Sequence, residues 1–224
     1  MSSRRRLLMA AGLRGHVDPN TGEILDDWER IGYICKKKQH KRCYKVGNWK
    51  AVQVDEKSLI KFEIIAMNAQ EKADGTGKAP ISWFAKSVVV GTTTAWGAFS
   101  SEYGWEQSSL RTRLNNFYYV NLPSDVKNVI TPVLNHNNVG GDTVDKLWLP
   151  MASECESGGI FNEKLGLPSQ RIRYTNALAE GWWLRSKHYG YPSGTRFSDF
   201  VRENGNFGSQ DASLSGCICF GFAT

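Results

Sequence analysis

Hydrophobic and polar positions follow a strand-like pattern over several parts of this chain. The segment Gly181-Trp182-Trp183-Leu184-Arg185-Ser186 places two tryptophans side by side. Successive side chains of a strand point to opposite faces, so these two rings can pack on both sides of one strand. The pattern predicts a central, buried strand. The polar residues 187–215 that follow predict a loop-rich surface that this strand supports.

Shorter patterns predict further β structure. Ile31, Tyr33 and Cys35 alternate with polar residues, and apolar positions continue to Val54, which predicts short strands between Trp28 and about Lys61. The remaining predicted strands are residues 61–67, 81–90, 147–150 and 216–222.

Two segments have the spacing of helices. Apolar residues recur at helical intervals within 105–117, which predicts a helix over about 108–118 with Ser108 as its N-cap. A second, short helix is predicted to begin at Ser124 and to end before Pro132.

These elements together predict an α+β fold: a twisted, mainly antiparallel sheet with one or two helices and long loops. We divide the chain into a basic N-terminal docking arm over 1–27, a β-rich N-terminal part over 28–60, and a main domain over 61–224. Residues 162–179 are expected to be mostly irregular.

Charge is unevenly distributed along the chain. The net charge is +6, but residues 1–50 hold 12 basic and 5 acidic residues, so the remaining residues are close to neutral. A basic arm can bind nucleic acid, an anionic membrane or an acidic protein surface. We do not expect nucleic acid, because no helix-turn-helix or zinc signature accompanies the charge. The residues expected to dock on a partner are Arg4, Arg5 and Arg6.

The five cysteines cannot form a complete set of disulfides. Cys35 and Cys43 flank a basic segment and could face each other across a hairpin, and the sequence leaves open whether they pair. Cys217 and Cys219 are expected on one buried strand face as small apolar side chains. We therefore expect reduced thiols and folding in a cytosol. Residues 4–13 contain too few apolar positions for a signal peptide or a membrane span.

Residues that could carry catalysis are scattered. None of the four histidines has metal-ligand spacing such as H-E-x-x-H, and the glycine-rich turn at 73–79 lacks the phosphate-loop pattern. Nothing in the sequence marks a cleft around Glu154 and Glu156. We therefore expect no enzyme, no catalytic residue, no metal and no cofactor. A calcium site remains an alternative, with Asp199, Glu203, Asn204, Asn206 and Asp211 as its candidate ligands.

The composition of 187–215 is typical of an adaptable binding surface, because it is rich in Tyr, Asn, Ser, Gly and Arg. In the alternative interpretation, Phe197, Phe200 and Val201 are core residues of a strand. The predicted ligand-binding residues are Tyr189, Tyr191, Arg196, Asn204, Asn206 and Phe207.

Arginines beside apolar residues predict structural contacts. Arg185 is expected to pair with a carboxylate, stack on an aromatic ring or cap backbone carbonyls. Arg111 and Asn115 lie one helical turn apart and are expected to tie their helix to neighbouring loops. The residues expected to have structural roles are Trp105, Arg111, Asn115, Trp182, Trp183 and Arg185.

Four segments carry a family resemblance in this order. They are residues 105–111 (WEQSSLR) with Leu114-Asn115 and Phe117, residues 145–150 (DKLWLP) with Glu154, residues 181–186 (GWWLRS), and residues 216–220 (GCICF). Together they resemble an uncharacterised domain family of gut bacteria and their phages, marked by a W-x-x-S-x-x-R-x-x-L-N helix and a W-W-L-R-S strand. The resemblance covers roughly residues 60–222. The chain departs from the family in its last strand, which lacks the usual Gly-Val-Arg-Pro type ending.

The resemblance implies a C-type-lectin-like fold for 61–224, shared with the formylglycine-generating enzyme superfamily and with the variable proteins of diversity-generating retroelements. It implies a non-enzymatic phage virion accessory or fibre-type protein that binds a host-surface glycan or protein. Such a protein would fold in the host cytoplasm, reside in the virion, dock on other virion proteins through its N-terminal arm, and form a homo-oligomer. The alternatives are a purely structural virion decoration or connector, and an enzyme of the formylglycine-generating type.

Overall fold

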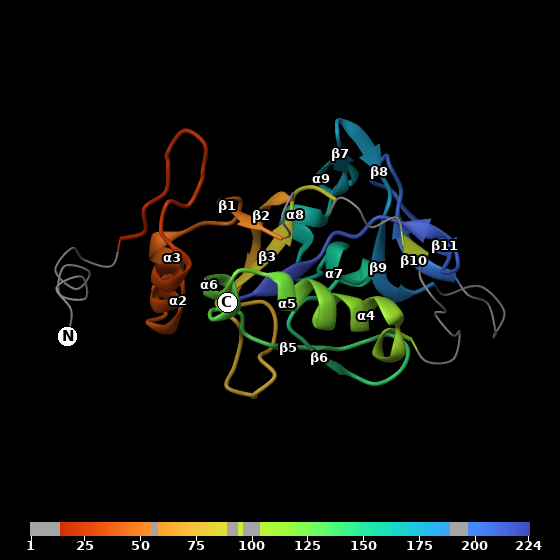
Figure 1. Ribbon diagram of the computed structural model, residues 1–224, viewed down its shortest axis with the longest axis horizontal. Helices are drawn as coiled ribbons and strands as arrows, with labels where there is room; N and C mark the ends of the chain where they lie inside the picture. The colour runs from red at the N-terminus through yellow and green to blue at the C-terminus, as the bar shows by residue number, and fades with distance from the viewer. Residues whose placement is uncertain (1–13, 55–57, 89–93, 96–103, 189–196) are drawn as a thin grey trace.

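The computed structural model describes residues 14–54, 58–88, 94–95, 104–188 and 197–224. These residues form a mixed α+β fold of small antiparallel sheets and short helices (Figure 1). The α+β class predicted from the sequence is confirmed. Within the described residues, no helix is long and apolar enough to cross a membrane.

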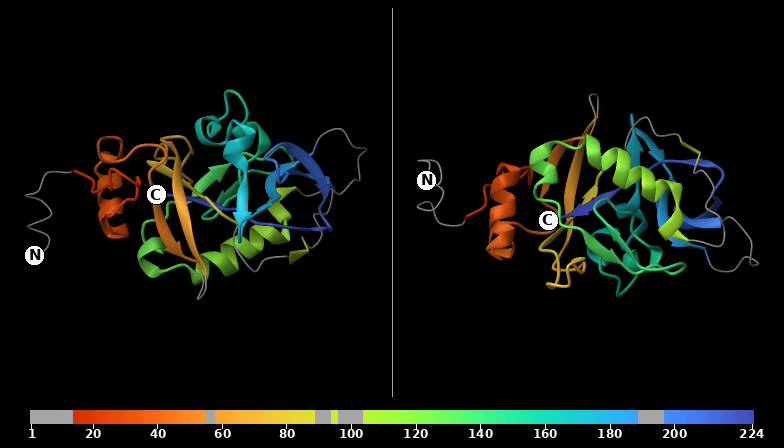
Figure 2. Two further views of the ribbon diagram at one scale, coloured as in Figure 1. Left: turned by 90° about the horizontal axis from the view of Figure 1, so that it is seen from above. Right: turned by 60° about the horizontal axis from the view of Figure 1, so that its bottom comes forward.

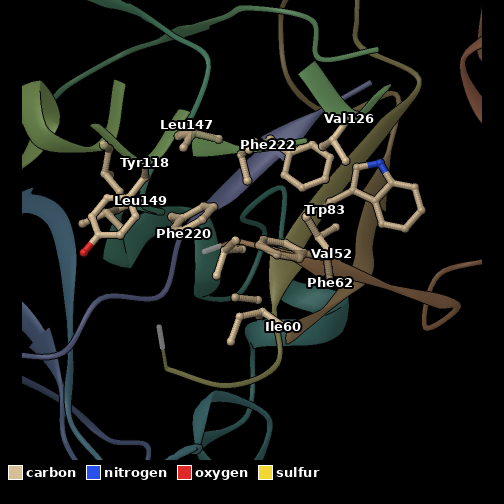
Figure 3. Close-up of a cluster of buried hydrophobic side chains, with 14 of the residues drawn as sticks. Val52, Ile60, Phe62, Trp83, Tyr118, Val126, Leu147, Leu149, Phe220 and Phe222 are labelled. Atoms are coloured by element: carbon tan, nitrogen blue, oxygen red, sulfur yellow. The ribbon is translucent and has the colours of Figure 1, made fainter. Parts of the chain in front are cut away.

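A four-stranded antiparallel sheet lies at the centre of the molecule. Its strands are ordered β1 (Trp49–Gln53), β2 (Leu59–Met67), β3 (Ile81–Ala85) and β13 (Gly221–Ala223). All five residues of β3 are buried, which fits a strand covered on both faces. Phe62, Trp83 and Phe222 from three neighbouring strands meet in the core shown in Figure 3. The strand predicted over 61–67 is therefore confirmed.

A second sheet contains the tryptophan pair. Its strands are ordered β11 (Phe207–Asp211), β10 (Phe197–Val201) and β9 (Trp182–Lys187). Trp182 and Trp183 have no exposed surface, so the predicted buried strand is confirmed. The prediction of a loop-rich surface over 187–215 is wrong for residues 197–211. These residues form a β hairpin in which strands β10 and β11 pair along five residues each. Its strand residues Phe200 and Val201 are buried.

Three further pairs of short strands complete the β structure. The pairs are β4 (Thr94–Ala95) with β12 (Ser215–Gly216), β5 (Val133–Asn135) with β6 (Thr143–Asp145), and β7 (Arg173–Thr175) with β8 (Leu178–Glu180). Two predictions need correction here. Residues 147–150 form no strand beyond a single bridge between Trp148 and Gly221, and the strand predicted over 216–222 is broken into β12 and β13.

The longest helical segment crosses one face of the molecule. After the 3-10 turn η1 (Trp105–Gln107), it runs through α4 (Ser109–Arg113), a π-helical turn η2 (Leu114–Tyr118) and α5 (Tyr119–Asn121). Ser108 is the N-cap, and its Oγ accepts a hydrogen bond of 3.0 Å from the amide of Arg111. The prediction of this helix is confirmed. The next helix, α6 (Ser124–Lys127), begins at the predicted residue.

The β structure predicted from Trp28 to Tyr44 is wrong. These residues form the helices α2 (Trp28–Lys36) and α3 (His40–Cys43). The Asp27 side chain caps α2 by accepting a hydrogen bond of 2.7 Å from the amide of Arg30. The buried apolar residues of α2 are spaced by three and four, which is helical periodicity and prevails over a short alternation. They are Trp28, Ile31, Ile34 and Cys35.

The described part of the predicted arm, residues 14–27, packs against the rest of the molecule. Ile24 is fully buried, and its amide donates to the carbonyl of Trp49 over 2.7 Å. The arm is therefore shorter than 1–27. The predicted docking residues Arg4, Arg5 and Arg6 lie outside the described residues.

Residues 162–179, expected to be irregular, contain regular elements instead. They hold α8 (Asn162–Leu165), α9 (Pro168–Arg171) and most of the β7–β8 hairpin. Another short helix, α7 (Ala152–Cys155), precedes them. Elements of three or four residues produce no periodic pattern, because each spans about one turn or one strand repeat.

Candidate functional site

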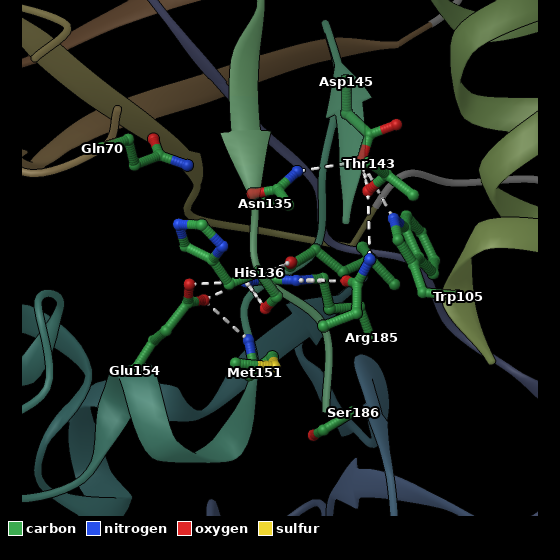
Figure 4. Close-up of polar contacts among 12 residues, drawn as sticks. Gln70, Trp105, Asn135, His136, Thr143, Asp145, Met151, Glu154, Arg185 and Ser186 are labelled. Carbon is green, nitrogen blue, oxygen red and sulfur yellow. Dashed lines mark hydrogen bonds and ion pairs between the residues drawn. The ribbon is translucent and has the colours of Figure 1, made fainter. Parts of the chain in front are cut away.

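Arg185 on β9 is buried, and its guanidinium forms a bidentate ion pair with Glu154 on α7 (Figure 4). Nη2 lies 2.5 Å from Oε1, and Nη1 lies 2.6 Å from Oε2. Nη1 also donates to the carbonyl of Leu149 over 2.7 Å. Glu154 accepts a further hydrogen bond from the amide of Met151. Of the three contacts that the sequence suggested for Arg185, the structure contains the carboxylate pair and the backbone cap.

Asp145 on β6 is a second buried carboxylate with several donors. Its oxygens accept hydrogen bonds of 2.6 Å from Arg111 Nε and 3.0 Å from Trp105 Nε1. The Asn135 amide and the Thr143 hydroxyl donate to Oδ2 over 2.9 and 2.8 Å. Because four donors surround this carboxylate, its charge is compensated inside the protein.

Two asparagines connect these groups to the backbone and to each other. Asn115 accepts hydrogen bonds from the amides of Lys146 and Leu147 and donates to the carbonyl of Leu147, so it ties the long helix to the segment after β6. Asn137 Oδ1 lies 3.2 Å from Arg185 Nε, and its amide donates to Thr143 Oγ1 over 3.3 Å. Asn137 therefore joins the two carboxylate clusters.

We call this connected set the polar centre. It consists of Trp105, Arg111, Asn115, Asn135, Asn137, Thr143, Asp145, Glu154 and Arg185. Four of the six residues predicted to have structural roles belong to it, namely Trp105, Arg111, Asn115 and Arg185. The other two, Trp182 and Trp183, pack in the apolar core.

The polar centre has no free reactive group. Both oxygens of Glu154 and both oxygens of Asp145 accept hydrogen bonds, so neither carboxylate is poised as a general base. A shallow hollow of about 310 Å³ borders Glu154 and is lined by residues such as Gln70, His136 and Ser153. The side-chain Oε1 of Gln70 accepts a hydrogen bond from the Ser82 hydroxyl, which holds the Gln70 side chain in place.

All five cysteines are described, and each is a free thiol. Burial raises the pKa of every one of them, to about 11 for Cys35 and for Cys217. Thiolates are scarce at neutral pH under these conditions, and the thiolate is the reactive form. This argues against chemistry of the formylglycine-generating type.

The candidate calcium ligands do not assemble. Asp199 contacts His188, while Asn204 and Asp211 accept hydrogen bonds from backbone amides of their own turns. Among the described residues, no group of three His, Cys, Asp or Glu side chains could hold a metal ion.

A set of exposed and half-buried polar side chains lies just outside the polar centre, where β9 ends. Asn138 forms two hydrogen bonds with the backbone of Lys187, of 2.8 and 3.1 Å. His188 Nδ1 lies 2.6 Å from Asp199 Oδ1 on β10. We call this set the polar rim; it consists of His136, Asn138, Asp142, His188 and Asp199. The His136 and Asp142 side chains are 62% and 49% exposed.

The predicted ligand-binding residues fall into two groups. Tyr189, Tyr191 and Arg196 lie outside the described residues and follow His188 of the polar rim in the sequence. The other three, Asn204, Asn206 and Phe207, lie at the opposite end of β10, because Phe197 pairs with Asp211 and Val201 with Phe207.

Phe207 is a partly buried residue with a structural contact. The guanidinium of Arg171 stacks on its ring at 3.9 Å, and the same guanidinium donates to the carbonyl of Gly205.

Sequence reasoning missed several residues of the site. The sequence patterns assign no role to Asn137 and Asn138, and no partner to Glu154. Their partners are 31 to 49 residues away in the sequence, a separation at which no periodic pattern exists.

The structure thus defines a mixed α+β domain built around a saturated polar centre. Residues 59–217 match a family model described as a domain of unknown function, DUF6273. The match covers more than half of the chain, so the protein belongs to this family. A search of curated proteins and a search of solved structures each found no match. The matched segment begins at β2 and contains the whole polar centre, whereas α2 and α3 precede it.

Proposed function

We propose that this protein is a non-enzymatic phage virion component whose C-type-lectin-like domain binds a host-surface glycan or protein. The polar rim is the observation that carries this proposal. Its histidine, amide and carboxylate groups gather at the end of β9, from which the connection with Tyr189, Tyr191 and Arg196 departs. Such groups hydrogen-bond to sugar hydroxyls and amides, and tyrosines stack on sugar rings or fill protein pockets.

The polar centre supports this proposal because it makes the rim rigid. Arg185 fixes β9 to α7, and Asn137, which bonds to Arg185, is followed directly by Asn138 of the rim. A binding surface held by buried, satisfied contacts loses little conformational entropy when it engages a ligand. In this interpretation, the motif residues hold the binding surface in place, and the residues next to the motif determine which ligand binds.

The remaining parts of the proposal concern assembly. The arginines Arg4, Arg5 and Arg6 would dock the protein on another virion component, and copies of the chain would form a homo-oligomer. The positive charge of the first fifty residues supports docking on an acidic surface.

The test is binding of the full-length, fluorescently labelled protein to cells of gut bacteria, the hosts that the resemblance implies. One variant carries Tyr189→Ala, Tyr191→Ala and Arg196→Ala beside the rim. The matched control carries Asn204→Ala and Asn206→Ala at the opposite end of β10. Replacing all of 188–211 is unsuitable, because that change would remove β10 and β11.

We expect the first variant to lose about tenfold or more in affinity and the control to bind like the wild type. The reverse pattern would place the binding surface at the other end of β10. If the folded wild type binds no host cell, the structural decoration or connector replaces our proposal. Circular dichroism and thermal unfolding establish that each variant is folded.

A further inference from the structure

A large cavity lies beside α2 and α3. Figure 2 shows in both views that α2 and α3 stand at one end and that β9 to β11 lie at the opposite end. The cavity has a volume of about 960 Å³ and is open to solvent. Its walls are α2, α3, the 68–80 loop after β2, and the segment around the end of α6. Its volume is in the range of small-molecule sites.

The lining of this cavity is strongly basic. It contains five lysines and only two acidic side chains, Glu29 and Asp125. The lysines come from separate parts of the chain and are Lys36, Lys38, Lys41, Lys72 and Lys78. Among the described residues, none of the five forms an ion pair, and Lys72 donates only to the Thr76 hydroxyl. Lysines that form no ion pair around a concave surface attract anions.

One buried polar side chain in the wall has no partner. His40 is 4% exposed, and neither of its ring nitrogens hydrogen-bonds to another described residue. Buried polar groups are almost always paired, so an unpaired one calls for an explanation. Burial lowers the pKa of His40, which the nearby Asn68 side chain opposes in part. The imidazole is therefore neutral at pH 7 and offers one donor and one acceptor.

We propose that this cavity binds a small phosphate ester with a hydroxyl-bearing body, such as a sugar phosphate. The lysines would contact the phosphate oxygens, while His40 would hydrogen-bond to a hydroxyl group of the ligand. A phosphate monoester carries nearly two negative charges, which suits a lining with an excess of three positive charges better than a single carboxylate does. Asn68, Asn128 and Thr131 add neutral groups that suit hydroxyls.

The site joins the family domain to the segment that precedes it. His40 and three of the lysines lie on α2 and α3 or just after α2, before the matched residues 59–217, whereas Lys72 and Lys78 lie within them. Binding of a ligand here would therefore hold the N-terminal helices against the domain. This inference is independent of the function proposed for the polar rim, because no rim residue lines the cavity.

The test titrates full-length protein with ribose 5-phosphate, with inorganic pyrophosphate, and with ribose as the uncharged control. Binding is measured by calorimetry and by the histidine ring resonances in two-dimensional NMR. One double variant, Lys38→Ala with Lys72→Ala, removes charges from two walls of the cavity. Its control, Lys37→Ala with Lys45→Ala, makes the same charge change at nearby lysines that do not line the cavity.

We expect ribose 5-phosphate to bind the wild type with a dissociation constant below about 1 mM and to shift the His40 ring resonances. We expect the cavity variant to lose about tenfold or more in affinity and the control variant less than about threefold. Equal losses in both variants, unmoved His40 resonances, or no binding by the wild type would each overturn the proposal. Binding of inorganic pyrophosphate in place of ribose 5-phosphate would overturn it as well.

Discussion

Buried polar groups have hydrogen-bond partners in the polar centre, whereas one in the basic cavity has none among the described residues. In the polar centre, the two carboxylates and Arg185 find partners inside the protein, at distances of 2.5 to 3.2 Å. In the cavity, the buried imidazole of His40 finds none, and five lysines face two carboxylates. Saturated groups stabilise one arrangement of the chain and have no bonding capacity left for a ligand. The sequence motifs alone direct attention to the polar centre, whereas unused hydrogen-bonding capacity remains in the cavity.

The largest expected effect comes from Arg185→Leu in the polar centre. The change leaves the Glu154 side chain, which is 16% exposed, without its bidentate partner, so we expect the free energy of unfolding to fall by about 3–5 kcal/mol. Urea denaturation followed by tryptophan fluorescence measures this loss. Adding Glu154→Leu should restore part of the stability, because the double variant has no unpaired charge. A loss below about 1 kcal/mol for Arg185→Leu would show that the pair does not stabilise the fold.

A smaller loss is expected from Asp145→Asn. The substituted amide has one oxygen for the four donors that now surround the carboxylate, and its NH2 group would face either the Arg111 donor or the Trp105 donor. We expect a loss of about 2–3 kcal/mol in the same urea experiment. Asp142→Asn is the matched control on the exposed rim, where the effect should stay below about 0.5 kcal/mol. Equal effects at the two positions would contradict the role assigned to Asp145.

In the cavity, we expect His40→Leu to leave stability unchanged or to raise it by up to about 1 kcal/mol. Leucine has a similar volume, and the change removes an unpaired buried polar group at no cost in protein hydrogen bonds. This outcome is opposite in sign to the two preceding ones. A loss of 2 kcal/mol or more would mean that His40 has a bonding partner in the folded protein.

The smallest effect is a difference in pH dependence. The folded pKa of His40 lies below its ordinary value of 6.5, so the unfolded chain binds this proton more readily. The contribution of His40 to stability is therefore full above pH 6.5 and is lost as the pH falls through the folded pKa. Thermal unfolding between pH 4.5 and 7.5 should show a weaker decrease for His40→Leu than for the wild type. Parallel curves would contradict the assignment.

Prediction from the sequence succeeded where local patterning is strong. Adjacent tryptophans determine β9, and Ser108 with the spacing of Leu110 and Leu114 determines the long helix. The prediction failed for α2. Ile31, Tyr33 and Cys35 alternate as in a strand, but the residues of α2 that are buried in the structure have helical spacing.

The two sites could be predicted only in part. The need of Arg185 for a partner follows from its apolar neighbours, but the identity of Glu154 depends on how α7 packs against β9. The basic cavity brings together residues 29 to 224 from several elements, so no local pattern indicates it.

The tryptophan pair has a consequence for folding cooperativity. Trp183 belongs to the apolar cluster under the four-stranded sheet, and Trp182 belongs to a separate cluster with Phe84, Trp148 and Phe161. A slip of β9 by one residue would exchange the two rings and disturb both clusters at once. Neither cluster can therefore rearrange while the other stays native, and the two should unfold together in a single transition.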